Sequence, residues 1–147
     1  MEKISFTKNF LFFSFLFLIT FIIIKSSPGF FPLFLPDSYD YVKFENSSSR
    51  NILYPAFYLF ITKLNLDIAK IQIVILTFSI CFLVFILNLI KIKKFLIFLF
   101  WVVITFNFYY TSFSKTILPE SIFFSLLNLS VGFLILTTKS KKNYSLL

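Results

Sequence analysis

The 147-residue sequence has no histidine, one cysteine, two glycines and five prolines. A single cysteine excludes a disulfide scaffold and a multi-cysteine metal site, and the lack of histidine removes the usual zinc ligands, so we expect neither a metal nor a cofactor. The scarcity of glycine and proline excludes collagen-like and linker-like chains. Charged residues make up only 14% of the chain, which is far below the roughly 25% of a typical soluble domain.

What the sequence does contain is apolar: 59% of its residues are hydrophobic, 22% are aromatic, and its mean hydropathy is +0.92. Four runs approach the roughly 20 apolar residues that cross a bilayer, at about 9–25, 70–90, 95–113 and 120–138. The first run is followed by Lys25 and Pro28 instead of a small-residue cleavage site, so it is typical of a retained helix. The sequence predicts an all-α, polytopic membrane protein: one membrane domain over residues 1–147 with about four transmembrane helices.

The net charge of +8 is distributed in short clusters at the ends of the apolar runs. Eight lysines lie before the first run, between the second and third, and after the fourth: Lys3, Lys8, Lys91, Lys93, Lys94, Lys139, Lys141 and Lys142. An even number of spans places these clusters on one side, which the positive-inside rule makes cytoplasmic. We therefore expect a bacterial inner or plasma membrane protein with cytoplasmic N- and C-termini. Clustered charge without one basic amphipathic face also argues against a nucleic-acid partner.

The segment 26–69 is expected to lie on the outer side, and it holds four of the six acidic residues. A fifth, Glu120, is expected on the same side. Its second half, 51–64, has the pattern of a short amphipathic helix. Ser47–Ser49 offer N-caps, and Pro55 falls near the first turn, where its missing N–H costs little. Such a helix is predicted to lie in the plane of the membrane interface.

Three short motifs in the outer segments resemble those of a known superfamily. Asp37-Ser38-Tyr39-Asp40-Tyr41 follows the first span, Arg50 and Tyr54-Pro55 open the interfacial helix, and Ile117-Leu118-Pro119-Glu120-Ser121 opens the fourth span. Together with the basic end of the second span, their order resembles the N-terminal part of the GT-C superfamily. These are polytopic glycosyltransferases that use lipid-linked sugars, such as the protein mannosyltransferases.

The resemblance implies a donor and a set of site residues. The donor would be a polyprenyl-phosphate-linked sugar, presented by membrane lipid on the outer face. Asp37 matches the acid that acts as general base on the acceptor, and partial desolvation at an interface would strengthen that base. Arg50 and Lys115 would bind the lipid phosphate. The remaining expected substrate-binding residues are Asp40, Tyr41, Tyr54 and Glu120.

Each of these residues also has a plainer interpretation. Asp37 and Asp40 flank a Pro/Ser turn, where aspartate bonds the backbone. Glu120 complements the dipole of a first helical turn, and Arg50 and Tyr54 are ordinary interfacial anchors. Inside the spans, ionisable residues are lacking, which argues against a proton relay. The amides Asn88, Asn107 and Asn128 are expected to form hydrogen bonds between helices.

The sequence therefore predicts a membrane glycosyltransferase, either the N-terminal portion of one or a short stand-alone version, because GT-C enzymes have many more spans. Two alternatives stay open at this point. One is a small non-enzymatic four-span protein, such as a lipid-sugar flippase subunit or an assembly partner. The other is a truncated, inactive reading frame. If the later helices of a GT-C enzyme are missing, the faces they would cover are expected to bind a partner membrane subunit.

Overall fold

The computed structural model describes residues 2–29, 33, 38, 42 and 53–144, and all regular elements among them are helices. This confirms the all-α prediction for the described part of the chain. The helices are α1 (Glu2–Ser26), α3 (Leu53–Lys63), α4 (Ile68–Leu89), α5 (Lys94–Thr105), α6 (Phe108–Phe113) and α7 (Glu120–Tyr144).

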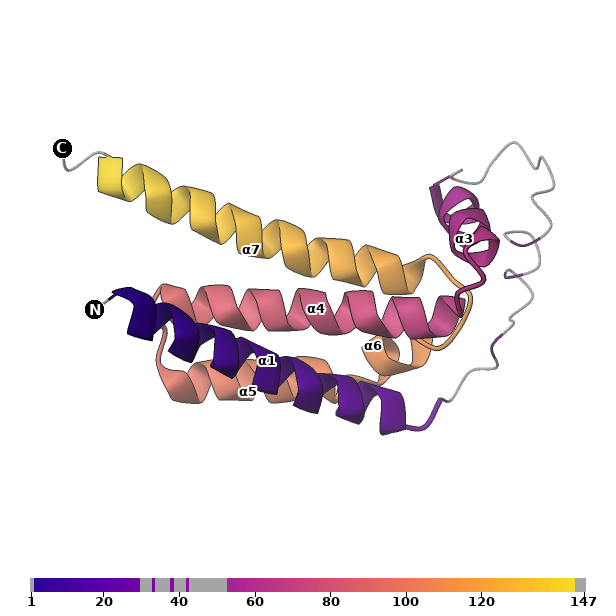
Figure 1. The fold of residues 1–147 in the computed structure, drawn as a ribbon, viewed down its shortest axis with the longest axis horizontal. Coiled ribbons are helices and arrows are strands. Elements are labelled where there is room, and N and C mark those ends of the chain that lie inside the picture. Colours follow the sequence, from indigo (N-terminus) through magenta and orange to yellow (C-terminus); the bar gives the residue numbers. More distant parts are fainter. Residues whose placement is uncertain (1, 30–32, 34–37, 39–41, 43–52, 145–147) are drawn as a thin grey trace.

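The helix α4 forms the centre of a bundle, with α7 on one side and α1 and α5 on the other (Figure 1). Half of its residues are buried, because its apolar side chains recur on nearly every face. The main core cluster joins Ile73, Leu76, Ile80 and Val84 of α4 to Ile24 of α1 and Ile97 of α5. Burial of this kind, at about 25 cal/mol per Å² of apolar surface, is the main force that holds the helices together wherever water is the competing environment.

Two helices of the described residues are long and apolar enough to cross a membrane, namely α4 and the part of α7 over Glu120–Thr138. They correspond to the expected spans 70–90 and 120–138. Two further apolar helices, Leu11–Ser26 and α5, are shorter. The structure thus contains two candidate spans by length and composition, compared with the four that the apolar runs predict.

The expected third span, 95–113, is divided between α5 and α6. At 1.5 Å per residue, the 12 residues of α5 extend about 18 Å, short of a hydrocarbon core of about 30 Å. The helix ends at Thr105, and the side chain of Asn107 then accepts hydrogen bonds from the backbone N–H groups of Tyr109 (3.0 Å) and Tyr110 (3.2 Å). Asparagine is among the best N-caps, so Asn107 starts a new helix where hydropathy alone predicts continuation.

Both ends of α4 are specified locally. The carboxylate of Asp67 caps the helix start, accepting from the N–H groups of Ala69 (3.0 Å) and Lys70 (3.2 Å). At the other end, Lys91 adopts a left-handed conformation with φ 61°, and the N–H of Ile92 bonds the carbonyl of Leu87. This Schellman-type turn reverses the chain into α5. Lys91, Lys93 and Lys94 consequently lie at the turn.

The ends of the long helices share sides of the bundle (Figure 1). The start of α1, the α4–α5 turn and the end of α7 lie at one end, while α3, α6 and the start of α7 lie at the other. We call these the basic end and the α3 end. The predicted lysine-rich connection between the second and third runs is therefore at the basic end.

The short helix α3 occupies the core of the expected segment 51–64, and Figure 1 views it nearly end-on, across the bundle direction. Pro55 is its third residue, as the sequence predicts. Tyr54 and Ile61 are buried against Ile68 and Ile117, whereas the apolar side chains of Leu53, Phe60 and Leu64 are exposed. The expected caps at Ser47–Ser49 lie outside the described residues.

Candidate functional site

Of the residues expected to act on a substrate, three are described and four are not. Asp37, Asp40, Tyr41 and Arg50 lie outside the described residues, so their roles stay predictions. Tyr54, Lys115 and Glu120 are described, and all three lie at the α3 end of the bundle. The sequence places them 66 positions apart at most, and the alternating direction of the helices brings them to one end.

A buried polar contact links three separate segments at this end. The side-chain amide of Gln72 in α4 donates to the phenolic oxygen of Tyr54 in α3 (2.9 Å) and to the carbonyl of Leu118 just before α7 (3.1 Å). Gln72 is fully buried and Tyr54 is only 5% exposed. Tyr54 is therefore anchored inside the protein, which differs from the belt-aromatic alternative, and its hydroxyl fixes α3 against the bundle.

Sequence reasoning missed Gln72, although a signal is present. It is the only glutamine in the chain, and it stands in the first turns of an otherwise apolar run. A buried amide must find partners because leaving it unpaired costs about 1–3 kcal/mol. An isolated amide in a predicted span therefore indicates a polar contact at that depth.

Several buried oxygens of the described residues at the α3 end have no hydrogen-bond partner. They are Gln72 Oε1, Ser112 Oγ, Glu120 Oε2 and Ser121 Oγ. Native proteins contain few such groups, and each one calls for a ligand, a water or a functional role. All four can accept a hydrogen bond, and two of them, Glu120 Oε2 and Ser121 Oγ, lie in the first turn of α7. The α3 end is thus rich in unused acceptors, which is the chemistry needed to hold hydroxyl-bearing ligands.

Glu120 is the first residue of α7, immediately after Pro119. Its position fits the expected acidic turn, and a carboxylate there complements the helix dipole. Its Oε2 atom, however, is buried and has no hydrogen-bond partner. An interaction with the helix dipole alone does not need such a buried oxygen. Glu120 therefore combines a structural position with unused acceptor capacity.

Lys115 has a structural role that sequence reasoning did not predict. Its ammonium donates to the carbonyl of Lys25 (3.2 Å), to the Ser27 hydroxyl (3.2 Å) and, at shorter range, to the Ser27 carbonyl. These are the free acceptors at the C-terminus of α1, where a cation is favourable. Burial lowers the pKa of Lys115 below its usual value. With its three donors engaged, Lys115 caps α1, and a phosphate would have to compete for it.

The three amides expected to bridge helices behave differently. Asn128 of α7 donates to the Ser79 hydroxyl of α4 at 3.3 Å, which confirms one bridge. Asn107 instead caps α6 within its own segment. Asn88 lines a cavity of about 430 Å³ between α1, α4 and α5.

An apolar cavity of about 260 Å³ lies beside Tyr54, between α3 and α7. Tyr54, Phe57, Pro119 and Ile122 are among its lining residues. It neighbours the start of α7 that carries Glu120. Groups of His, Cys, Asp and Glu able to hold a metal ion are lacking among the described residues.

Comparisons with protein families, curated proteins and solved structures find no match to this chain.

Proposed function

We propose that this chain is a membrane protein with four membrane-crossing segments, α1, α4, the α5–α6 pair and α7, and that it belongs to a GT-C-type glycosyltransferase. In this proposal a sugar passes from a polyprenyl-phosphate donor to an acceptor at the α3 end, which faces outward. The basic end faces the cytoplasm, together with both termini.

Surface chemistry supports the membrane location. Large apolar side chains are exposed on α1, α5 and α7, where water would be an unfavourable neighbour; examples are Phe15, Phe95, Phe98, Val103, Phe123 and Leu134. So many exposed large apolar side chains are typical of proteins embedded in lipid or joined to partners. Lysines gather at the basic end, which supports the orientation.

The main support for a glycosyltransferase activity is the carboxylate oxygen Oε2 of Glu120, which is buried and unpartnered at the same end of the bundle as Tyr54. The motifs that resemble GT-C enzymes include an acid at the opening of the fourth span and a tyrosine-proline pair at the opening of the interfacial helix. Both are found at one end of the bundle. A buried acceptor suits a sugar hydroxyl, and an apolar cavity lined by Tyr54 and Pro119 lies between α3 and the start of α7.

The proposed reaction uses Asp37 as general base. The acceptor hydroxyl or amine loses its proton to the Asp37 carboxylate as its oxygen or nitrogen bonds to the anomeric carbon of the sugar. The bond from that carbon to the phosphate oxygen breaks, and the polyprenyl phosphate leaves as an anion. Arg50 would neutralise this anion bidentately.

The test is transfer from a radiolabelled polyprenyl-phosphate sugar by membranes that contain the chain. Asp37→Asn should abolish turnover at unchanged insertion. Asp67→Asn is the matched control, because asparagine caps a helix as well as aspartate does and Asp67 lies in the same outer segment. Equal turnover by wild type and Asp37→Asn would refute the role of Asp37.

A second candidate is a non-enzymatic assembly partner, and one observation favours it. The α7 helix is largely exposed along its apolar length, including Leu126, Leu127 and Phe133. Such a face fits another transmembrane helix as well as lipid. Absence of turnover, together with copurification of one stoichiometric membrane protein, would select this candidate.

A further inference from the structure

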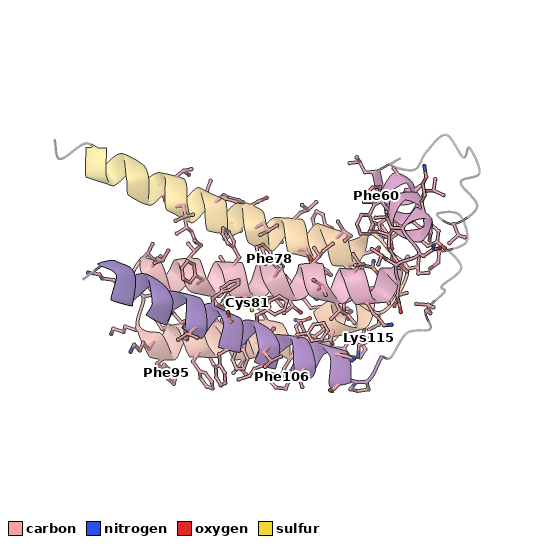
Figure 2. All side chains as sticks on the ribbon, viewed as in Figure 1. Phe60, Phe78, Cys81, Phe95, Phe106 and Lys115 are labelled. Carbon is pink, nitrogen blue, oxygen red and sulfur yellow. The ribbon has the colours of Figure 1, made fainter. Side chains whose placement is uncertain are left out.

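A third cavity, of about 410 Å³, lies between the end of α1 and the α5–α6 junction. Its size falls within the usual range of about 300–1,000 Å³ for small-molecule sites. Its lining includes the hydroxyl residues Ser26, Ser27, Thr105 and Thr111 and the aromatic residues Phe106 and Phe108. Figure 2 labels Phe106 at this junction and Lys115, whose ammonium bonds Ser27.

Thr105 provides the unused polar group of this cavity. It is fully buried, and its hydroxyl has no hydrogen-bond partner. Other buried threonine hydroxyls have partners: that of Thr77 donates to the Ile73 carbonyl (2.7 Å), that of Thr111 donates to the Phe108 carbonyl (3.1 Å), and that of Thr20 accepts from the Trp101 indole (2.9 Å). A buried hydroxyl that is left unpaired costs about 1–3 kcal/mol, so Thr105 is suited to receive a partner from the cavity.

The break in the helix adds a second indication. With Lys94 at the basic end, α5 rises about 18 Å, so the junction at Phe106 lies inside a hydrocarbon core of about 30 Å. Irregular backbone is tolerated at that depth where it lines a polar cavity, and interrupted helices commonly form the ligand sites of membrane proteins.

The lining also indicates the class of ligand. It contains hydroxyls and aromatic rings but no charged side chain. Lys115, whose ammonium bonds Ser27 of this lining, already gives its donors to the end of α1. An uncharged, hydroxyl-rich group can exchange hydrogen bonds with Thr105 and Ser26 and place its C–H faces on Phe106 and Phe108, whereas a phosphate would find no cation among the lining residues.

We propose that this cavity binds the sugar headgroup of a membrane lipid, with the Thr105 hydroxyl as a direct hydrogen-bond partner. The inference rests on the membrane location in the proposed function. Two sources carry this chemistry, a glycosyl diacylglycerol and a polyprenyl-phosphate sugar, and the test separates them.

The test uses the full chain in phosphatidylcholine nanodiscs with a glucosyl diacylglycerol that carries a photoreactive diazirine on its sugar. Crosslinks should map to the α5–α6 junction. Unlabelled glucosyl diacylglycerol, polyprenyl-phosphate glucose, diacylglycerol and sugar-free polyprenyl phosphate serve as competitors. Competition by either sugar-bearing lipid, but by neither sugar-free one, supports the proposal and identifies the source.

Three variants define the role of Thr105. Thr105→Val keeps the shape and removes the hydroxyl, so the affinity for the competing lipid should fall by about two- to tenfold, the worth of one hydrogen bond. Thr105→Ser should retain wild-type affinity within about twofold, and Thr77→Val, whose hydroxyl is already bonded within α4, should leave it unchanged.

Competition by sugar-free polyprenyl phosphate, or crosslinks unaffected by all competitors, would overturn the proposal; the second result would mean that the labelling is not specific for a sugar headgroup. Equal loss in Thr105→Val and Thr77→Val would also overturn it. Because binding is measured separately from transfer, sugar-specific competition without turnover would refute the glycosyltransferase and keep this site.

Discussion

Gln72 donates a hydrogen bond of 2.9 Å to the phenolic oxygen of Tyr54, which lies 18 residues earlier in a different helix. The same amide group bonds the Leu118 carbonyl, so one buried side chain ties α3, α4 and the start of α7 together. This contact holds Tyr54, one of the expected substrate residues, against α4 and the segment before α7.

Tyr54→Phe should lower the free energy of unfolding by about 1 kcal/mol, since one buried hydrogen bond is lost. Gln72→Leu removes the same bond from the other side. The double variant should therefore be less destabilised than the sum of the single variants by about 1 kcal/mol, as measured by unfolding in mixed micelles. Strictly additive effects would show that the two side chains are not coupled.

Lys115→Met should loosen the end of α1, because three acceptors at the α1 terminus lose their donor. Faster amide hydrogen exchange at residues 23–27 would reveal this change. Lys63→Met is the control, since Lys63 is exposed at the end of α3. Equal exchange rates in both variants would exclude the capping role.

The lowered pKa of Lys115 also predicts a pH effect. Between the lowered folded value and the usual 10.5, the unfolded chain holds more protons than the folded chain, so the free energy of unfolding should rise with pH in that interval. Lys115→Met should lack this rise. A thermal-melting series from pH 8 to 10.5 measures it, and a wild-type decrease specific to Lys115 would contradict the assignment.

Asp67 caps α4, and its replacement should affect stability according to capping ability. Asp67→Ala should cost about 1 kcal/mol, whereas Asp67→Asn should cost little at neutral pH. Burial raises the pKa of Asp67, but the hydrogen bonds and charge of Lys70 outweigh it, so the net pKa is lowered. Its charge-dependent stabilisation should therefore fade as the pH drops through and below 3.8, and Asp67→Asn should not show that loss. Parallel acid melting curves for both proteins would disprove this linkage.

Gly132 allows α7 to approach α4. A Cβ atom at this position would lie 2.7 Å from Cε1 of the Phe82 ring. The ring is only half-buried and can turn, and alanine favours the helix, so Gly132→Ala should be nearly neutral. Gly132→Leu should cost about 1–3 kcal/mol by overpacking. The neighbouring exposed position provides the control Val131→Leu, and a similar loss there would assign the effect to the helix surface instead.

The proposed orientation of the chain in the membrane can be tested by cysteine labelling in a Cys81→Ser background. Lys63→Cys at the α3 end should react with an impermeant maleimide in intact cells, whereas Lys93→Cys at the α4–α5 turn should react only after permeabilisation. Both side chains are exposed in the fold. The reverse pattern would invert the topology, and labelling of both positions would argue against an odd number of crossings between them.

The sequence predicts the long helices well and the α3 end less well, for physical reasons. The runs 70–90 and 120–138 correspond to α4 and α7 because long apolar stretches have few alternative structures. The run 95–113 contains an equally apolar stretch, yet the side chain of Asn107 ends it by capping α6, an effect that hydropathy does not register. The caps formed by Asp67 and Asn107 can both be predicted from the local sequence, because aspartate and asparagine are preferred N-cap residues.

Tertiary relationships explain what sequence reasoning missed at the site. Gln72 reaches its partners only once three segments meet, and Lys115 finds the end of α1 across 88 positions of sequence. The isolated amide of Gln72 indicates a polar contact but does not identify its partners, and the contact of Lys115 has no local signature. Glu120 was accessible to sequence reasoning through its place at a helix start, but its buried free oxygen depends on the packed bundle. The expected base Asp37 lies outside the described residues and stays a prediction.

The most direct test of the central claim is sugar transfer from a polyprenyl-phosphate donor, compared between wild type, Asp37→Asn and Asp67→Asn at equal amounts of inserted protein. The account predicts turnover by wild type and Asp67→Asn and a loss of at least about 100-fold in Asp37→Asn, the lower limit of a general base. Equal activity in all three proteins would contradict Asp37 as the base, and no transfer by any of them would contradict the glycosyltransferase itself.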